Sequence, residues 1–549
     1  MTNKELAELM YPNVKKTIYD YEKIYPEREL PDGAIVSRYA PSPTGFVHMG
    51  NMLSCFIENK LPEQTNGIFY LRIEDTDQKR EIENGIDNII NAMKIIGLNY
   101  NEGVISKKIQ KGSYGPYIQS ERQEIYDTFA KYMIENDMAY PCFCDENDLE
   151  NIRKSQQQRK SRIGYYGKYA KCRYLSNEER AAKIKNGVPF TIRLKSTGSY
   201  DNKICIEDLV KGKLYFPEND QDIILIKSNK IPVYHFAHVV DDHLMRTTHV
   251  LRGEDWLSSL PVHVELFSKF GFKLPKYAHL GLVMLIDENG VKRKISKRKD
   301  LKYSISNFDE MGFPQEALQE YLMTIANTNF ESWRDINPLK DISEFKFSFS
   351  KIGSGPLFDM SKLINLSKNV ISRMSAHELY EKTYEWSKKH SETLKRIIEK
   401  DPLYYESILN IEREQEKPRK DIPYYSTIWD MIWYMYNDEF DMRHKEYEWK
   451  NITEMVEIKN ILNTYIDKYY NDDDDKETWF NKIKELCGLY GYASNIKEYK
   501  KNPEKYKGNV ADVSTVIRVA VTTKSNTPDL YEIMKLLGKK EILKRINML

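Results

Sequence analysis

The first hundred residues alternate between two spacings of hydrophobic positions. An apolar segment at 34–40 precedes the turn PSPTG, after which the apolar residues recur at helical spacing. These residues are Met52, Leu53, Phe56 and Ile57. The segment GIFYLRIED at 67–75 alternates, with Phe69, Leu71 and Ile73 expected on one face and Tyr70, Arg72 and Glu74 on the other. A second helical pattern is carried by Ile86, Ile89, Ile90 and Met93. Repeated strand, turn and helix units predict an α/β fold with a parallel sheet.

The rest of the chain changes pattern several times. The part that begins at 116 is irregular and holds five Gly and four Cys, so it is interpreted as an insertion into the sheet domain. A second α/β block follows and ends in the basic loop KRKISKRKDLK, after which strand signals thin out and helical patterns take over. The expected segments are a helical N-terminal extension at 1–34, two halves of an α/β domain at 35–115 and 226–300, the insertion at 116–225, a connecting region at 301–375 and a helical region at 376–549.

Composition excludes several classes of protein. The 549 residues are 41% hydrophobic and 30% charged, which is typical of globular proteins rather than disordered or fibrous ones. The most apolar run, LGLVMLI at 280–286, is far shorter than the roughly 20 residues that span a bilayer, and the N-terminus lacks an apolar secretory core. We therefore expect a cytoplasmic protein without a membrane partner. Lys and Arg number 83 against 82 Asp and Glu, so a polyanion would bind through local patches.

Two segments could bind phosphate. In PSPTGFVHMG, a helix is expected to begin near His48 and Gly50, where backbone N–H groups and the helix dipole attract anions. In the basic loop, Lys294 and Lys297 suit the charge that develops in phosphoryl transfer. Taken alone, His48 could be a structural histidine and the loop a solvated one.

Several long motifs resemble one family. SRYAPSPTGFVHMGN at 37–51, FYLRIEDTDQKR at 69–80 and KISKR at 294–298 are similar to a class I aminoacyl-tRNA synthetase of the glutamyl type, with the first string matching its HIGH region and the last its KMSKS loop. YHFAHVVDDHLMRTTHVLRGEDW at 234–256 and SGPLFDMSKL at 354–363 continue the resemblance, which reaches 516–538. It implies a Rossmann-like catalytic domain with an inserted acceptor-stem-binding domain, a stem-contact region and a mostly α-helical anticodon-binding region of the bacterial kind.

The resemblance also implies site residues. Arg38, Ser42 and Arg252 would hold substrate carboxylates, Glu74 would face the α-ammonium, and Tyr234 would line the pocket. ATP, with Mg²⁺, would contact His48, Gly50, Asp255, Lys294, Ser296 and Lys297, and the catalytic residues among these would be His48, Lys294 and Lys297. His238 occupies a position that varies in the family. The alternative is that Arg72, Glu74, Asp75 and Asp77 form only a surface ion-pair network.

A group of cysteines lies in the insertion. Cys142 and Cys144, with Cys172 further on, resemble the zinc knuckle of some family members, and Tyr174 stands where a fourth ligand is expected. Tyrosine is an uncommon zinc ligand. Buried structural cysteines are the alternative.

The expected reaction is the ligation of glutamate to tRNA(Glu) through glutamyl adenylate, and the resemblance allows tRNA(Gln) as a second substrate. We also expect a monomer. The helical C-terminal region argues against the glutaminyl enzyme, which has a β-barrel anticodon module, and the length argues against the truncated paralogue that modifies a tRNA base. Two other classes stay open. One is a nucleotidyltransferase that adenylates a small acid without RNA, and the other is a catalytically silent tRNA-binding protein.

Overall fold

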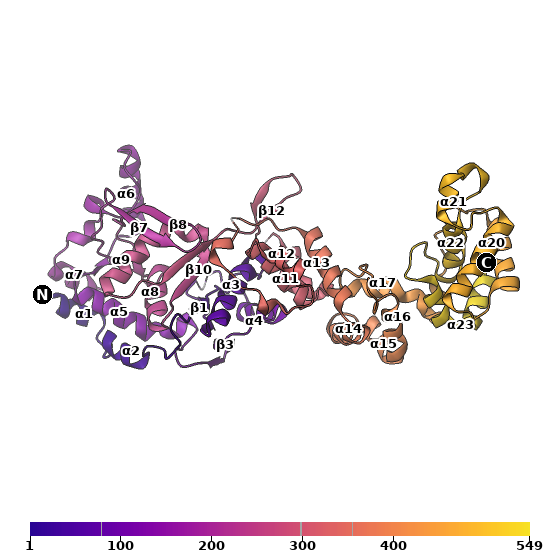
Figure 1. Cartoon of the computed structure of the whole chain (residues 1–549). Coiled ribbons are helices and arrows are strands. Elements are labelled where there is room, and N and C mark those ends of the chain that lie inside the picture. The colour runs from indigo at the N-terminus through magenta and orange to yellow at the C-terminus, as the bar shows by residue number, and fades with distance from the viewer. Residues whose placement is uncertain (78, 297–298, 354) are drawn as a thin grey trace. The chain divides into compact units, whose positions relative to one another are not determined.

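The structure is a computed structural model that describes residues 1–77, 79–296, 299–353 and 355–549. Its contacts divide the chain into two compact units (Figure 1). Unit 1 comprises residues 1–308 and 318–360, and unit 2 comprises residues 309–317 and 361–549. Among the described residues, no helix has both the length and the apolar character needed to cross a membrane.

The N-terminal extension is helical, as expected, and it is packed against the rest of unit 1. Helices α1 (Asn3–Met10) and α2 (Ile18–Ile24) each begin with a capping box, at Thr2 and Thr17. Both helices contact α5 (Gln123–Glu135). The extension is therefore part of the folded unit.

One sheet of unit 1 contains the first strands of the chain. Strands β1 (Val36–Tyr39), β2 (Ile68–Leu71) and β3 (Glu102–Ser106) run parallel, and β4 (Ile109–Lys111) adds an antiparallel edge. Helix α3 (Met49–Thr65) packs on β1 and β2, and α4 (Gly85–Ile96) packs on β3. The apolar residues expected on these two helices are all buried, which confirms both helical predictions.

The two faces expected for the segment 67–75 are both buried in the structure. Phe69, Tyr70 and Leu71 are all buried, the strand ends at Leu71, and Arg72 is fully buried beyond it. A strand in a sheet that is covered on both faces has consecutive residues buried, and a buried charge such as that of Arg72 must be paired. The polar face of this segment is consequently an interior one.

The second sheet combines strands from two parts of the sequence. Strands β10 (His249–Gly253) and β11 (Lys276–Leu280) run parallel, β7 (Lys203–Asp208) runs parallel beside β11, and β8 (Gly212–Pro217) pairs antiparallel with β7. This sheet lies next to the first, because the Thr248 N–H donates to Val36 O at 3.0 Å and Val36 N–H donates to Thr248 Oγ1 at 2.8 Å. Helices α8 (Tyr234–Leu244) and α9 (Leu260–Phe270) pack against each other beside it.

The segment expected as an insertion is divided between two sheets. Strands β5 (Ala139–Cys142), β6 (Thr191–Leu194) and β9 (Ile224–Ile226) form a separate antiparallel sheet, accompanied by α6 (Glu146–Gln158) and α7 (Asn177–Lys185). The β7–β8 hairpin instead extends the sheet of β10 and β11. Part of this segment is thus built into the sheet of β10 and β11.

A hairpin and a run of helices follow β11 along the sequence. Strands β12 (Met284–Ile286) and β13 (Lys292–Lys294) form a hairpin that carries the basic loop (Figure 1). The helices that follow are α10 (Ile305–Met311), α11 (Gln315–Ala326), α12 (Phe330–Ile336) and α13 (Met360–Arg373).

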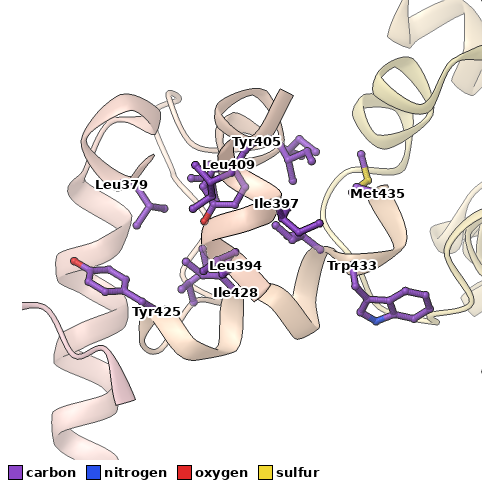
Figure 2. Close-up of a cluster of buried hydrophobic side chains, with 14 of the residues drawn as sticks. Leu379, Leu394, Ile397, Tyr405, Leu409, Tyr425, Ile428, Trp433 and Met435 are labelled. Carbon is purple, nitrogen blue, oxygen red and sulfur yellow. The ribbon is translucent and has the colours of Figure 1, made fainter. Parts of the chain in front are cut away.

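Unit 2 is helical, which confirms the prediction for the C-terminal third. Its first core lies between α14 (Ala376–His390), α15 (Glu392–Lys400), α16 (Pro402–Asn410), α17 (Ile428–Ile432) and α18 (Asn437–Arg443). Figure 2 shows Tyr405, Leu409 and Leu394 close together in this core, and Tyr405 is fully buried. A second core is formed by α19 (Met455–Thr464), α20 (Lys476–Tyr490), α22 (Val510–Thr522) and α23 (Leu530–Asn547), and α21 (Ile496–Lys501) is short and has no buried residue.

Candidate active site

A cavity of about 540 Å³ lies beyond the carboxyl ends of β10 and β11. In open α/β sheets, ligands bind at this edge. The residues that line it include His48 and Gly50 from the start of α3, Gly253, Asp255 and Trp256 after β10, and Lys294 and Ser296 from the basic hairpin. The two segments that the sequence assigned to phosphate therefore meet at one cavity.

His48 is the N-cap of α3. Its Nδ1 accepts a hydrogen bond from the Gly50 N–H at 3.1 Å, and its own N–H donates to Asn51 Oδ1 at 3.3 Å. Because Nδ1 is the acceptor, a neutral His48 carries its proton on Nε2. A Cβ on Gly50 would stand 3.1 Å from the His48 ring, so glycine allows the imidazole to fold over the helix start.

The basic hairpin is held by carboxylates on either side. Lys294 Nζ lies 2.9 Å from Asp255 Oδ2. Asp300 accepts hydrogen bonds from Arg293 at 2.7 and 2.8 Å and from the Ser296 N–H at 2.7 Å. The hydrogen bond from Arg293 is the main cause that lowers the pKa of Asp300 to about 2. Lys297, the other predicted catalytic lysine, lies outside the described residues.

Arg252 lies near the end of β10 with part of its guanidinium engaged. Its Nε donates to His279 Nε2 at 3.0 Å, and its Nη1 lies 3.3 Å from Tyr234 Oη and 3.1 Å from His263 Nδ1. Its Nη2 is buried and has no hydrogen-bond partner among the residues that the structure describes. A buried charged donor without a partner costs free energy, so Nη2 is suited to bind an anion from outside the protein.

Arg38 and Glu74 belong to a buried ionic network. Arg38 Nε lies 3.2 Å from both carboxylate oxygens of Asp242, and Arg72 bridges Asp242 at 2.6 Å and Glu74 at 3.0 Å. Although burial raises the pKa of Asp242, Arg38 and Arg72 hold it well below its usual range. All four side chains are buried, so the alternative of a surface ion-pair network is wrong for Arg72 and Glu74.

Tyr234 and Trp256 connect the cavity to Arg252. Their ring centroids are 4.3 Å apart, and Trp256 lines the cavity while Tyr234 contacts Arg252. Ser42 lies half-buried on the turn after β1. Within the described residues, no hydrogen bond links its hydroxyl to Arg38 or Arg252. Four of the five residues assigned to glutamate thus lie in one region of the interior. The fifth, Ser42, lies on the turn after β1.

His238 is engaged by protein groups at both ring nitrogens. Its Nδ1 lies 2.8 Å from Asp242 Oδ2 and its Nε2 lies 3.1 Å from Tyr277 Oη. Burial lowers the pKa of His238 to about 4, so the ring is neutral near pH 7. His238 therefore supports the Asp242 network.

Three cysteines of the insertion come together. The Sγ atoms of Cys142, Cys144 and Cys172 lie within 4.8 Å of one another. Tyr174 does not join them, since its side chain is 68% exposed. The structure places Tyr165 there instead, with its Oη 3.4 Å from Cys142 Sγ and 3.3 Å from Cys144 Sγ. The prediction that Tyr174 joins the cysteines is therefore wrong, and the tyrosine beside the thiols is Tyr165.

The chemistry of this cluster fits a metal. Hydrogen bonds from Cys144 and Cys172 lower the pKa of the Cys142 thiol, which favours the thiolate form that binds metals. Three sulfurs and one phenol oxygen make four donor atoms, the number that zinc binds in structural sites. The described cluster could therefore hold zinc.

Sequence reasoning missed four residues of this region. Asp242 and Asp300 are the anions that fix the buried arginines and the basic hairpin, Trp256 forms a wall of the cavity, and Tyr165 faces the thiols. One of them had a usable signal, because His238 and Asp242 are four residues apart in a helical pattern. The other three depend on contacts between distant segments.

The geometry defines a class of binding site. A parallel sheet whose first turn leads into a helix capped by His48, facing a lysine-bearing hairpin across a cavity, is an arrangement of an α/β protein that suits a phosphate-containing ligand.

Comparisons with known proteins identify the family. The family model described as tRNA synthetases class I (E and Q), catalytic domain, matches residues 34–365, and an anticodon binding domain matches residues 362–549. The chain belongs to this class I tRNA synthetase family. It is 46% identical to a glutamate–tRNA ligase of Acetivibrio thermocellus and 43% identical to one of Clostridium perfringens, and each alignment covers 100% of both chains. A crystal structure of a glutamate tRNA ligase from Elizabethkingia meningosepticum shares the fold, with a TM-score of 0.72 at 23% identity over 94% of this chain and 98% of that one.

Proposed function

We infer that this chain is a glutamate–tRNA ligase. Glutamate and ATP give glutamyl adenylate and diphosphate, and the glutamyl group then passes to the 3′ end of tRNA(Glu) with release of AMP. The observation that carries this inference is the position of Trp256, which lines the phosphate-suited cavity and contacts Tyr234. Tyr234 in turn contacts Arg252, whose Nη2 has no hydrogen-bond partner among the described residues. Full-length relatives with this activity in their names support it.

Activation needs positioning more than proton transfer. A glutamate carboxylate, with an ordinary pKa near 4, is ionised at neutral pH and can attack the α-phosphorus of ATP directly. Arg252 and Arg38 would hold the carboxylates of glutamate, and Glu74 its ammonium. Burial raises the pKa of Glu74, and the neighbouring Arg72 opposes this shift, so the ion pair helps to keep the carboxylate charged for an ammonium.

Charge stabilisation on the phosphates falls to the cavity residues. Attack forms the bond between the glutamate oxygen and the α-phosphorus and breaks the bond to diphosphate, which gathers negative charge. The Nε2–H of His48 and the ammonium groups of Lys294 and Lys297 would stabilise that charge, with Mg²⁺ entering as part of the ATP complex. Gly50, Ser296 and Asp255 would complete the contacts to ATP. The terminal ribose hydroxyl of tRNA then attacks the activated carbonyl, and AMP leaves.

The insertion is proposed to bind the acceptor stem, with zinc as a structural ion. Cys142, Cys144, Cys172 and Tyr165 would hold it, and bound zinc would cross-link β5 to the segment around Cys172. Residues 301–375 are proposed to contact the tRNA stem and 376–549 the anticodon. We further propose that the enzyme acts as a monomer and that tRNA(Gln) is a second acceptor.

Measurements of tRNA charging, diphosphate exchange and tRNA binding separate the candidate functions. Purified tRNA(Glu) and tRNA(Gln) are each incubated with the protein, ATP and radiolabelled glutamate, and the label attached to tRNA is counted. Charged tRNA is the expected product. Glutamate-dependent exchange of diphosphate into ATP without any transfer would indicate a nucleotidyltransferase, and tRNA binding without either reaction would indicate a silent binding protein. Charging of tRNA(Glu) alone would overturn the proposal that tRNA(Gln) is a second acceptor.

A further inference from the structure

The β7–β8 hairpin brings a carboxylate to the back of the amino-acid pocket. Asp208 is the last residue of β7 and is only 2% exposed. Its Oδ1 accepts the N–H groups of Val210 at 3.0 Å and Lys211 at 2.9 Å, both in the hairpin turn. The turn thus fixes one oxygen of this carboxylate and leaves the other for a different partner.

That partner is a histidine of the neighbouring strand. Asp208 Oδ2 lies 2.6 Å from His279 Nδ1 and accepts the His279 backbone N–H at 3.1 Å. Because a carboxylate accepts, His279 Nδ1 carries the ring proton and Nε2 has a free lone pair. Nε2 lies 3.0 Å from Arg252 Nε, which can only donate, so both neighbours require the same tautomer. Arg252 and His279 are also opposite each other in the parallel pairing of β10 and β11.

The donors of Arg252 can be counted. A guanidinium has five N–H groups, of which Nε contributes one to His279 and Nη1 contributes two toward His263 and Tyr234. His263 is neutral by the same reasoning, since its Nδ1 accepts from Arg252 while its Nε2 lies 3.0 Å from His235 Nδ1. The two N–H groups on Nη2 are those without a partner among the described residues.

We infer that Asp208 and His279 are positioning residues for the amino-acid substrate. The Asp208 carboxylate sets the tautomer of His279, and His279 holds the Arg252 guanidinium so that Nη2 remains for the glutamate carboxylate. This inference rests on the proposed function, in which Arg252 binds that carboxylate. All three side chains are at most 7% exposed, so water competes little for these hydrogen bonds. Burial also lowers the pKa of His279, which keeps the ring neutral.

The substitution Asp208→Asn tests the tautomer directly. Asparagine has nearly the same shape, and the N–H groups of Val210 and Lys211 would keep its oxygen at the Oδ1 position. Its NH₂ group would then face His279 Nδ1 and force the ring proton onto Nε2, against the Arg252 donor. We expect the KM for glutamate in tRNA charging to rise about tenfold or more, the loss typical of a hydrogen bond to a charged group, while the KM for ATP stays within twofold.

A pair of substitutions at His279 provides a second measurement. In His279→Gln the side chain can reach the Nε2 position and still offer an oxygen to Arg252. In His279→Asn it can reach only the Nδ1 position and keep the bond to Asp208. We expect the asparagine variant to raise the KM for glutamate several times more than the glutamine variant. Equal effects in the two variants would mean that His279 only fills space.

The matched control is Asp222→Asn. Asp222 is also a fully buried carboxylate of residues 116–225, but its partners are Tyr140, Arg173 and the Ser196 N–H. The KM for glutamate of the Asp222→Asn variant should equal that of the unaltered protein. Thermal melting should show that each variant is folded. An unchanged KM in folded Asp208→Asn, or an equal rise in Asp222→Asn, would overturn the inference and leave the proposed function intact. Failure of the unaltered protein to charge tRNA with glutamate would instead overturn the proposed function.

Discussion

Lys294 Nζ lies 2.9 Å from Asp255 Oδ2, and both side chains line the cavity beside the capping histidine of α3. Both are about half exposed, so their ion pair contributes little to folding, and in the proposed ATP complex a phosphate would replace the carboxylate as the partner of Lys294. We expect Lys294→Ala to lower the rate of glutamate-dependent diphosphate exchange about tenfold or more, measured with tRNA present, and to leave the melting temperature unchanged. A folded variant with the normal rate would contradict the assignment.

Lys297→Ala should have the largest effect on activation. The proposed contact strengthens as charge gathers on the phosphates, so single-turnover adenylate formation should fall about 10²-fold or more while ATP affinity changes much less. Lys107→Ala, at an exposed turn between β3 and β4, is the control for loss of a positive charge. Near-normal adenylate formation in the Lys297 variant would contradict the assignment of KISKR at 294–298 as the KMSKS loop.

His48 has two separable roles. In His48→Asn the side chain can still cap α3, because asparagine is a favoured N-cap, but the imidazole is lost. We expect this variant to melt normally and to activate glutamate slowly, whereas His48→Ala should also lose about 1 kcal/mol of folding free energy. Calorimetry and diphosphate exchange on the same samples test both parts. Equal activity of the asparagine variant and the unaltered protein would leave His48 as a cap alone.

The cysteine cluster predicts a metal content of about one zinc per chain. Cys144→Ser should lose the metal and weaken binding of the acceptor stem more than binding of glutamate. Tyr165→Phe should lower zinc affinity, because it removes the fourth donor, and Tyr174→Phe is the matched control at the exposed tyrosine. Elemental analysis measures the outcome. Full activity of metal-free protein would support the alternative that the cysteines are buried structural residues.

Acid should destabilise unit 1 through His235. Burial and then the charge of Arg252 lower the pKa of His235 to about 4, against about 6.5 in the unfolded chain. Between these values the unfolded state binds a proton that the folded state does not, so stability falls as the pH falls from 6.5 to 4, by about 3 kcal/mol at most. Urea unfolding at several pH values should show a shallower fall in His235→Gln. Parallel curves for the two proteins would assign the acid sensitivity to other groups.

Local patterns were reliable where local contacts decide the structure. Ile86, Ile89, Ile90 and Met93 alone indicate the buried face of α4, and the turn after β1 indicates where α3 begins. The alternation at 67–75 does not reveal that the polar face is buried, because the partner of Arg72 is Asp242, which is far away in sequence. The choice between Tyr165 and Tyr174 likewise depends on how the chain folds back on β5, which spacing along the sequence does not reveal.

The position of the β7–β8 hairpin limits which segments of this enzyme can be exchanged with those of a relative. A chimaera that exchanged residues 116–225 for those of a relative would also replace the strand beside β11, and with it the Asp208 carboxylate behind Arg252. Such a graft would exchange the proposed positioning residue of the amino-acid pocket together with the proposed acceptor-stem module. The exchangeable module is therefore the sheet of β5, β6 and β9 with its helices, and the hairpin is inherited with the host.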